Sequence, residues 1–268
     1  MTDRLARLTS MRGRVALVTG AAGHVGQVAA ETLAEMGADL LLTDLDQTRL
    51  DGIAAELAPR FGVRVVGAAI DLADEAALRA LPTRAEAELG GLDAVLHSAA
   101  FVGTSGLKNW AVPFEQQGSD AWRAALEVNL TSAFVLAQAA TPLLARSGHG
   151  AIVLLSSIYG LVGPDMRLYE GLGMGNPAAY AASKGGLIQL ARWLATTVAP
   201  RVRVNVISPG GIWRNQPEPF VERYQARTPL GRMATEDDLV GAIAYLCSDL
   251  SAYVTGQNLV VDGGWCSW

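Results

Sequence analysis

The chain has few of the residues that build metal sites, disulfide frameworks or nucleic-acid interfaces. Among its 268 residues are two cysteines, Cys247 and Cys266, and three histidines, and these form no cluster in the sequence. We therefore expect no metal site, structural zinc included, and no disulfide framework. The 21 basic residues are outnumbered by 26 acidic ones and form no basic run, which argues against nucleic-acid binding as the main task.

Membrane signals are also missing from the sequence. Residues 1–14 are polar and charged, without the apolar core of a signal peptide, and no apolar run elsewhere reaches the length of a membrane span. Only 18% of the residues are charged whereas 50% are hydrophobic, so we expect a well-buried core rather than disorder. The sequence thus predicts a soluble, cytoplasmic protein with no membrane partner.

Short β-rich apolar runs alternate with longer alanine-rich helical patterns. The predicted strands are 14–19, 39–43, 64–69, 94–97, 151–156, 202–207 and 258–261. The predicted helices are 24–36, 46–58, 74–89, 120–146, 178–198 and 235–247, and the irregular stretches are 101–119, 160–177 and 209–234. Repeated strand–helix–strand units predict an α/β, Rossmann-type, doubly wound fold, in which a parallel seven-stranded sheet carries helices on both faces.

We assign residues 1–268 to a single domain with three parts. Residues 14–100 mainly bind a dinucleotide, 101–234 supply the catalytic and substrate loops, and 235–268 provide a C-terminal helix, a strand and an oligomer segment. The irregular stretches all follow predicted strands. In an open parallel sheet the ligand crevice lies beyond the carboxyl ends of the strands, so these stretches are where ligands are expected.

A glycine-rich turn follows the first predicted strand and opens a helix. It contains Gly20, Gly23, His24, Val25 and Gly26. Glycines at such a turn permit close approach of a pyrophosphate, which the helix N-terminus favours through its free N–H groups and dipole. The alternative is a purely structural glycine turn.

An acidic residue, Asp44, ends the second predicted strand about 20 residues beyond the glycine turn. Its carboxylate can accept hydrogen bonds from both adenosine-ribose hydroxyls and would repel a 2′-phosphate, so we expect NAD, with NADP less favoured. The nearest basic residue, Arg49, is five positions on. Asp71, next to Leu72 after the third strand, is a candidate contact for the adenine amino group. The alternatives are a solvated loop aspartate or helix cap for Asp44, and a helix N-cap for Asp71.

Tyr180 and Lys184 are four residues apart on one predicted helix, which places them on the same face. A cation near a phenol favours the phenolate. At ~4 Å and an effective dielectric of about 20, the interaction is worth about 4 kcal/mol. We therefore expect the pKa of Tyr180 to be lowered by roughly two to three units, which would let it act as an acid or base near neutral pH.

With these motifs in this order, the chain resembles a short-chain dehydrogenase/reductase over essentially its full length. Further matching motifs are Val128-Asn129-Leu130, Leu155-Ser156-Ser157, Ser208-Pro209-Gly210-Gly211, Val254-Thr255-Gly256-Gln257 and Val261-Asp262-Gly263-Gly264. The resemblance implies a catalytic tetrad of Asn129, Ser157, Tyr180 and Lys184. Ser157 would hydrogen-bond the substrate oxygen, Tyr180 would take the alcohol proton, and Lys184 would bind the nicotinamide ribose. The Asn129 backbone would hold a proton-relaying water.

The resemblance also implies cofactor contacts beyond the glycine turn. Pro209, Gly210, Gly211 and Ile212 would line the nicotinamide, and Ser98 and Ala99 would lie beside the cofactor. The chain departs from the family pattern at three places. His24 replaces a glycine and His97-Ser98-Ala99-Ala100 replaces Asn-Asn-Ala-Gly, which leaves His97 a candidate neighbour of the cofactor. Trp213-Arg214-Asn215 stands where the family has a threonine.

The substrate end carries an insert. Ser157 and Tyr180 are 23 residues apart, roughly ten more than in many relatives of the family, and the extra residues are 163–176. We expect Arg167, Tyr169 and Glu170 from this insert, together with Trp213, Arg214 and Asn215, to contact the substrate. An arginine beside hydroxyl-binding carboxylates suits a polyhydroxylated substrate, which also carries a phosphate in one version of this hypothesis. The alternative for the insert is a surface loop or a subunit contact.

These motifs look like a subgroup from surface-carbohydrate and nonulosonic-acid pathways, which implies a place in carbohydrate metabolism. The leading hypothesis is an NAD-dependent oxidoreductase that interconverts a secondary alcohol and a ketone on a sugar, sugar phosphate or polyol. The alternatives are an NAD-dependent sugar epimerase or dehydratase of the extended type, indicated by the glycine spacing, and a non-catalytic dinucleotide-binding regulator. The family further implies a homodimer or homotetramer, paired through the helices that contain Asn129 and Tyr180 and through the C-terminal segment.

Overall fold

The computed structural model describes residues 4–102 and 105–268. Seven parallel strands form one sheet in the order β3-β2-β1-β4-β5-β6-β7. The strands are β1 (Val15–Thr19), β2 (Asp39–Asp44), β3 (Val65–Ala69), β4 (Ala94–His97), β5 (Ala151–Leu155), β6 (Arg203–Pro209) and β7 (Asn258–Val261). The predicted Rossmann-type sheet is confirmed, and the strand order reverses between β1 and β4, where such folds bind their ligand.

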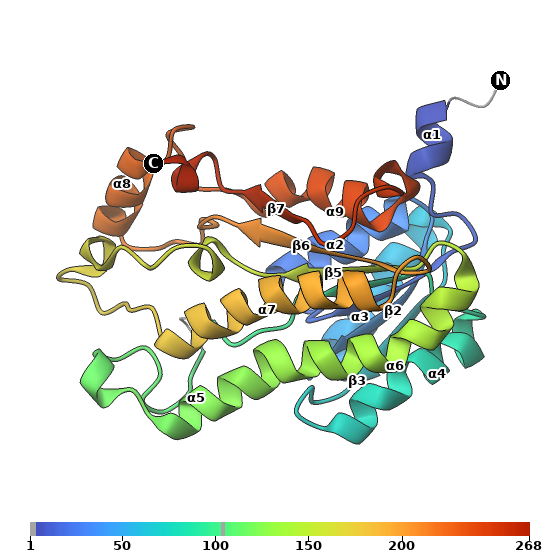
Figure 1. Ribbon diagram of the computed structural model, residues 1–268, viewed down its shortest axis with the longest axis horizontal. Coiled ribbons are helices and arrows are strands. Elements are labelled where there is room, and N and C mark those ends of the chain that lie inside the picture. The colour runs from blue at the N-terminus through green and yellow to red at the C-terminus, as the bar shows by residue number, and fades with distance from the viewer. Residues whose placement is uncertain (1–3, 103–104) are drawn as a thin grey trace.

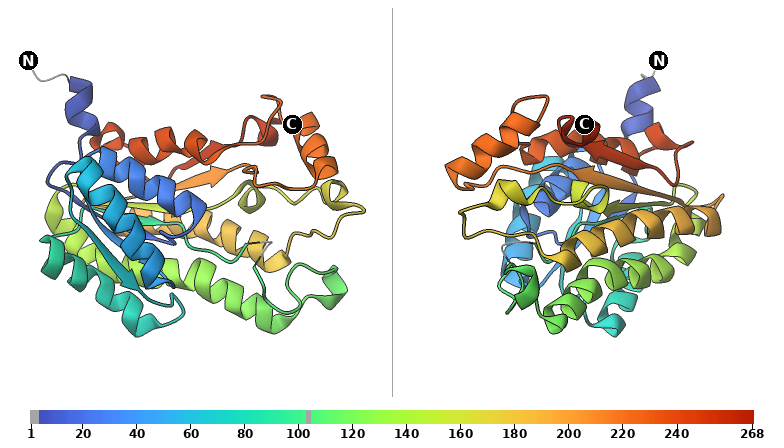
Figure 2. Two further views of the ribbon diagram at one scale, coloured as in Figure 1. Left: turned by 180° about the vertical axis from the view of Figure 1, so that it is seen from behind. Right: turned by 60° about the vertical axis from the view of Figure 1, so that its left-hand side comes forward.

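Helices cover both faces of the sheet, as expected (Figure 1, Figure 2). One face packs against α2 (His24–Glu35), α3 (Gln47–Phe61) and α9 (Val240–Cys247), and the other against α4 (Glu75–Leu89), α6 (Ser132–Ser147) and α7 (Ala178–Thr197). Every residue of β1, β4 and β5 is buried. Strands enclosed on both sides explain why these segments read as continuous apolar runs.

The helix predicted over 120–146 is continuous in space but changes its winding. It consists of α5 (Ser119–Leu126), a π-helical turn η2 (Glu127–Thr131) and α6. By length and composition alone, Ser119–Ser147 would be long and apolar enough to cross a membrane, contrary to the expectation that no segment is. Half of its most apolar window is buried inside the fold, because the α6 part is a core helix packed against α4.

Among the described residues, two α-helices were not predicted. The helix α1 (Arg4–Thr9) precedes the sheet, and α8 (Glu218–Arg227) lies within the stretch 209–234 that was expected to be irregular. Pro217 caps α8 and Pro219 occupies its first turn, where proline is compatible with a helix. Phe220, Val221 and Tyr224 form its buried face. The stretch is irregular only on either side of α8.

Candidate functional site

The glycine turn between β1 and α2 is closed by backbone contacts. Gly20 has φ +68°, and a Cβ on it would lie 2.8 Å from the backbone of Ala99, which follows β4. A Cβ on Gly26 would lie 2.0 Å from the carbonyl oxygen of Gly20. Gly23, the N-cap of α2, has no side chain to cap the helix. The turn therefore leaves the first N–H groups of α2 free of a side-chain cap, an arrangement that fits a phosphate.

His24, the first residue of α2, is largely exposed, and its Nδ1 lies 3.9 Å from Oε1 of Glu236. Glu236 begins the short helical turn η5 (Glu236–Leu239). No group of three or more His, Cys, Asp or Glu side chains that could hold a metal is found among the described residues. The structure thus places His24 at the mouth of the glycine turn, beside a carboxylate.

Asp44, at the end of β2, is bound to the glycine turn itself. Its carboxylate accepts hydrogen bonds from the backbone N–H of Ala22 at 2.9 Å and of Leu45 at 2.7 Å. Arg49 is a neighbour of this turn that the sequence did not indicate. Its Nη2 donates to the carbonyl of the same Ala22. Arg49 is five residues beyond Asp44, but the first turn of α3 brings its side chain back. The helical pattern starting near residue 46 was the signal that would have revealed this.

Asp71 does not cap a helix, contrary to the structural alternative considered for it. Its Oδ1 accepts from the N–H of Ala73 at 2.9 Å in a local turn, and Asp74 is the N-cap of α4. The Asp71 side chain is exposed, whereas Leu72 is in the core. Asp71 therefore remains at the surface beyond β3, where it stays a candidate for the adenine.

Ser157, Tyr180 and Lys184 come together at the carboxyl end of β5. Ser157 follows β5 and is 8% exposed, and its Oγ accepts from the N–H of Tyr159 at 3.2 Å. Tyr180 and Lys184 lie in the first two turns of α7. Nζ of Lys184 is 5.7 Å from the centre of the Tyr180 ring and donates to the carbonyl of Leu155 at 2.7 Å. A serine, a phenol and an ammonium from two elements thus share one buried corner.

The expected lowering of the Tyr180 pKa is wrong for this structure. Burial is the largest influence and raises the pKa of Tyr180, against the lowering effect of its hydrogen bond with Ser157. Lys184 is itself 2% exposed, and burial lowers its pKa to about 7. The pKa of Tyr180 would be lowered only if a permanent positive charge lay close to the phenol. Here the ammonium is desolvated and bound to a carbonyl instead.

Asn129 lies in the π-helical turn and is fully buried. Its side-chain oxygen accepts from the N–H of Phe101 at 2.7 Å, and its amide donates to the Phe101 carbonyl and to Oγ of Ser183, each at 3.1 Å. The side chain therefore ties the loop after β4 to α7, next to Tyr180 and Lys184. Single π-helical turns within α-helices are frequent at functional sites.

His97 does not face a cofactor. Its side chain is in the core at the end of β4, where Nδ1 is 2.9 Å from Oγ1 of Thr19 and Nε2 is 3.2 Å from Oγ of Ser132. Burial, helped by the charge of Lys184, lowers the pKa of His97 to about 3, so the ring is neutral. Ser98 donates to the Thr19 carbonyl at 2.6 Å. His97 and Ser98, which stand at the positions of the family's two asparagines, thus join β4 to β1 and α6.

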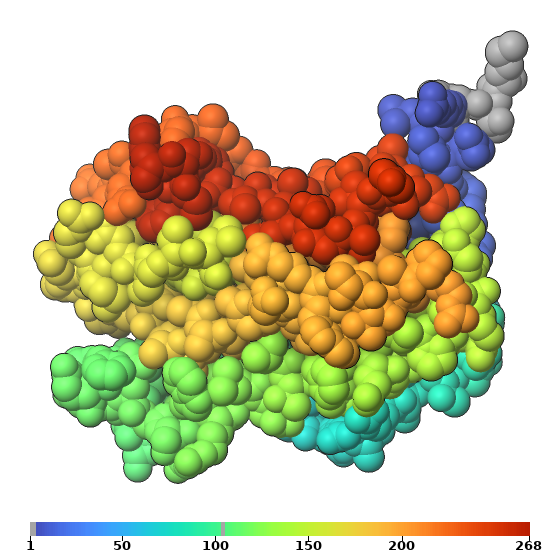
Figure 3. Space-filling model, in the orientation of Figure 1, coloured from blue at the N-terminus to red at the C-terminus, as the bar shows by residue number. Residues whose placement is uncertain are grey.

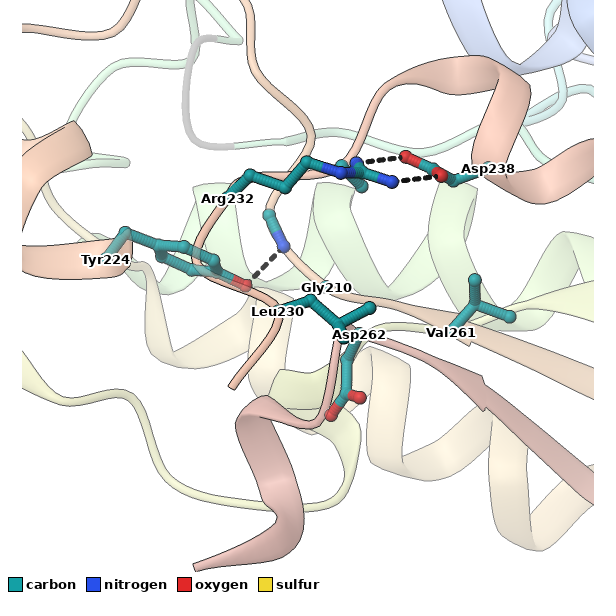
Figure 4. A pocket seen from close by; sticks show the side chains of 10 residues that line it. Gly210, Tyr224, Leu230, Arg232, Asp238, Val261 and Asp262 are labelled. Carbon is teal, nitrogen blue, oxygen red and sulfur yellow. Dashed lines mark hydrogen bonds and ion pairs between the residues drawn. The ribbon is translucent and has the colours of Figure 1, made fainter. Parts of the chain in front are cut away.

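The segment after β6 is held from behind by α8. The N–H of Gly211 donates to the hydroxyl of Tyr224, and Gly210 and Gly211 line a cavity of about 110 Å³ with Arg232, Asp238 and Asp262 (Figure 4). None of the predicted tetrad lines this cavity. It backs the segment that is expected to line the nicotinamide, and we do not assign the substrate to it.

Beyond Ile212 the chain turns sharply. Trp213 is 50% exposed, and Asn215 adopts a left-handed conformation with φ 57°. Arg214 donates from Nε to Oε1 of Glu236 at 2.9 Å. None of these three predicted substrate residues lines the cavity, and Trp213 and the Arg214–Glu236 pair lie at the surface.

The insert 163–176 is a structured element. Asp165 binds the guanidinium groups of Arg167 and of Arg227 in α8, and Arg223 donates to three carbonyls of the insert. Arg167 itself is 76% exposed at its side chain, and Glu170 is exposed as well. No contact recorded for the described residues joins either of them to Ser157 or Tyr180. The insert is thus held by Arg223 and Arg227 of α8, whereas Arg167 pairs with Asp165 inside the insert.

Tyr169, in contrast, points into the protein. Its hydroxyl lies 2.9 Å from that of Tyr159, and its ring begins a row that continues through Phe220 and Tyr224 to Trp265. Trp265 is therefore a core residue rather than an exposed contact. In Figure 3 the insert (yellow) and the loop before α5 (green) border a hollow at one end of the molecule. Tyr169 is the insert residue best placed beside the catalytic corner.

Known proteins match both the sequence and the fold of this chain. The family model described as enoyl-(acyl carrier protein) reductase matches residues 20–266. A cis-4-hydroxycyclohexanecarboxylate dehydrogenase of Sinomonas cyclohexanicum is 35% identical over 94% of this chain and 96% of its own length. The chain belongs to the short-chain dehydrogenase/reductase family. Its members are oxidoreductases that bind a nicotinamide dinucleotide and act on small molecules.

Two solved structures of the family show how closely the fold is shared. A short-chain alcohol dehydrogenase of Sinorhizobium meliloti 1021 has a TM-score of 0.86 and 33% identity, covering 97% of this chain and 99% of its own. A short-chain dehydrogenase of Leptospira borgpetersenii, solved with bound NAD+, has a TM-score of 0.84 and 31% identity over 99% and 96% of the two chains. The insert and α8 are thus accommodated within the common fold.

Proposed function

We propose that this protein is an NAD-dependent dehydrogenase that interconverts a secondary alcohol and a ketone. The convergence of Ser157, Tyr180 and Lys184 in one buried corner carries this proposal. Bound NAD supplies the hydride acceptor at C4 of its nicotinamide. The remaining chemistry, binding the alcohol oxygen and moving its proton, falls to the chain's own side chains.

Ser157 and Tyr180 would both contact the oxygen of the alcohol. Tyr180 takes the proton as the alcohol becomes a ketone and returns it in the reverse reaction. Its raised pKa means that the phenol holds its proton at neutral pH in the structure described, which suits the donor role in ketone reduction. A protonated Lys184 near the ring would favour the phenolate needed for alcohol oxidation, because opposite charges attract strongly in a buried site. The side chain of Asn129 is occupied by Phe101 and Ser183, so its part in the proton path falls to its backbone.

NAD is the cofactor that we infer from Asp44. Its carboxylate is held at the end of β2 by two backbone N–H groups and would repel a 2′-phosphate. Arg49 weakens this preference, because its guanidinium reaches the same turn. We therefore expect NAD to be favoured over NADP by a moderate factor, and Asp44→Ser to reverse that order while Arg49 is present.

We propose a polar ring, sugar-like or cyclitol-like, as the substrate. Tyr169 and Tyr159 supply hydroxyl groups near Tyr180, and the exposed ring of Trp213 supplies a flat apolar face. The Sinomonas relative, by its name, acts on a ring carrying a secondary alcohol. This combination supports a ring alcohol as the substrate. The sugar pathways expected from the sequence are one source of such an alcohol.

Exposed aromatic side chains on α6, on α7 and at the chain end favour self-association of the protein. Phe134 on α6 and Trp193 on α7 are 40% and 56% exposed, and Trp268 at the chain end is 74% exposed. We propose that α6 and α7 pair across a two-fold axis to form a dimer, and that the C-terminal segment extends it to a tetramer in the cytoplasm. Sedimentation of a monomer would contradict this part of the proposal.

The decisive experiment is a screen of cyclic alcohols, polyols, sugars and sugar phosphates with NAD and NADP separately, read as absorbance of the reduced cofactor. We expect stoichiometric NADH with at least one ring alcohol and a lower rate with NADP. An isomerised sugar without net NADH would replace the proposal by the epimerase alternative. Binding of NAD without turnover of any alcohol or ketone would favour a non-catalytic role.

A further inference from the structure

Arg214 belongs to a charged cluster that spans the mouth of the cofactor site. Its Nε lies 2.9 Å from Oε1 of Glu236, and the same oxygen lies 3.9 Å from Nδ1 of His24. His24 is the first residue of α2, and η5, which contains Glu236, packs against α2. Arg214 is therefore one carboxylate away from the helix N-terminus at which the cofactor's diphosphate is expected.

The loop around Arg214 holds that position firmly. The N–H of Arg214 donates to Oε1 of Gln216 at 2.7 Å, and Nε2 of Gln216 donates to the carbonyl of Ile212 at 2.8 Å. Two backbone hydrogen bonds between this loop and Ala234, at 2.8 and 3.0 Å, then fix its register against the segment that leads to Glu236. Arg214 and Glu236 thus face one another because of the backbone, and their side chains remain 36% and 24% exposed.

Arg214 is also close enough to the catalytic corner to influence it electrostatically. Its positive charge lowers the pKa of Tyr180, although burial outweighs this effect. A dinucleotide that starts at Asp44 and ends beside Tyr180 and Lys184 must cross the space between α2 and that corner. The diphosphate links the two halves of the cofactor, so it would lie between them, at the N-terminus of α2.

The carboxylate of Glu236 and the cofactor's phosphates would bring like charges together at the N-terminus of α2. Glu236 places a carboxylate beside the N-terminus of α2, where two phosphate charges must also be accommodated. Like charges at short range in a partly buried site repel strongly unless a cation lies between them. A guanidinium suits that role, because its fan of N–H groups can bind carboxylate and phosphate oxygens at the same time.

We propose that Arg214 binds the cofactor's diphosphate, either while it still contacts Glu236 or after it has released Glu236. Glu236 competes with the diphosphate for Arg214 and so weakens cofactor binding. This assignment rests on the proposed use of a nicotinamide dinucleotide. It moves Arg214 from the substrate set, where the sequence placed it, to the cofactor set. The stretch Trp213-Arg214-Asn215 stands where the family pattern has a threonine, so an ionic contact from Arg214 would depart from that pattern.

Binding of ADP-ribose, measured by calorimetry, tests the proposal without any turnover. We expect Arg214→Gln to weaken ADP-ribose binding about tenfold, the size of effect expected from one charge-assisted hydrogen bond. AMP, which lacks the nicotinamide-side phosphate, should be affected less than about twofold on the same reasoning. Glu236→Gln should tighten ADP-ribose binding by about threefold, because Arg214 loses its competitor. Arg232→Gln is the matched control, since it removes an arginine paired with Asp238 in the same region.

The outcomes separate this proposal from the proposed function. If the unmodified chain binds neither NAD nor ADP-ribose, the proposed function fails. If it binds both and Arg214→Gln keeps full ADP-ribose affinity, only the assignment of Arg214 fails. An equal loss for AMP, or for the Arg232→Gln control, would show a general charge effect and would also overturn it. Retained AMP affinity in Arg214→Gln excludes a folding defect, because a damaged site would lose AMP as well. A Glu236→Gln variant that gains no affinity would overturn the competition between Glu236 and the cofactor.

Discussion

The cofactor end and the substrate end of this molecule are built by different means. At the glycine turn, backbone meets backbone, and a single Cβ on Gly26 would lie 2.0 Å from a carbonyl oxygen. At the insert, side chains far apart in sequence meet, as Asp165 does with Arg227 of α8. The first arrangement is a close approach of backbone segments at the ends of neighbouring strands, and the second depends on side chains about 60 residues apart in the chain. This difference separates what the family shares from what this chain adds.

Tyr180 lies where the two ends meet, and its replacement should have the largest effect. Tyr180→Phe removes the hydroxyl that exchanges the proton, so we expect kcat to fall by about 10³, within the range seen for general acid–base groups. ADP-ribose affinity should stay within about twofold, because the change leaves the cofactor contacts intact. Steady-state rates and calorimetry together measure this. Full turnover by the variant would remove Tyr180 from the mechanism.

Gly26→Ala should damage the cofactor end itself. The added methyl group must displace backbone rather than a flexible side chain, so we expect the free energy of unfolding to fall by about 3 kcal/mol and cofactor binding to be lost. Gly23→Ala is the matched control, since its Cβ would lie 3.2 Å from the Gly20 carbonyl at an ordinary φ of −77°. Denaturant unfolding compares the two variants. Equal effects would mean that the turn is less tightly closed than it is described here.

Lys184→Met should change how stability depends on pH. Burial lowers the folded-state pKa of Lys184 to about 7, against about 10.5 when unfolded, so between these values the unfolded chain binds more protons. Stability from this group therefore increases as pH rises from about 7 to 10. The thiols of Cys247, which is buried, and of Cys266, which is half-buried, act in the opposite sense, because their pKa values are raised to about 12.

Comparing the variant with the unmodified protein cancels the contribution of the thiols. We expect Lys184→Met to be the more stable of the two at pH 7, by a margin that shrinks toward pH 9. Urea unfolding at three pH values measures the margin. A margin independent of pH would show that Lys184 is not desolvated.

Asp165→Asn tests the substrate end and should have the smallest effect. We expect a loss of about 1 kcal/mol in the free energy of unfolding and a several-fold higher KM with little change in kcat, because the insert is loosened while the catalytic corner is kept. The hydrogen bonds from Arg167 and Arg227 hold the pKa of Asp165 well below its usual range. The stabilisation is therefore present above the unfolded pKa near 4 and is lost as pH falls further.

Unfolding at pH 7, 5 and 3 with matched substrate kinetics measures these effects. Glu75→Gln is the control, since it breaks an exposed pair with Arg79 on α4. An unchanged KM would mean that the insert does not shape the substrate site.

The sequence predicted the sheet, the glycine turn and the placement of Tyr180 near Lys184, because each follows from local spacing. It missed α8, since the prolines at its start and its charged residues hid the buried face of Phe220 and Tyr224. It also misjudged His97, whose role depends on Thr19 and Ser132 from other elements. The sign of the Tyr180 pKa shift depends on burial, which spacing alone does not give.

The row of rings from Tyr169 to Trp265 packs the insert, α8 and the chain end together as one unit. Trp268 at the C-terminus donates to the carbonyl of Arg227, the same residue that binds Asp165 and lies 4.6 Å over the ring of Trp265. Transplanting the insert alone into a relative would leave Asp165 and Tyr169 without their partners. We therefore expect the insert, α8 and the chain end to be inherited together, and a chimera to fold well only if it receives all three.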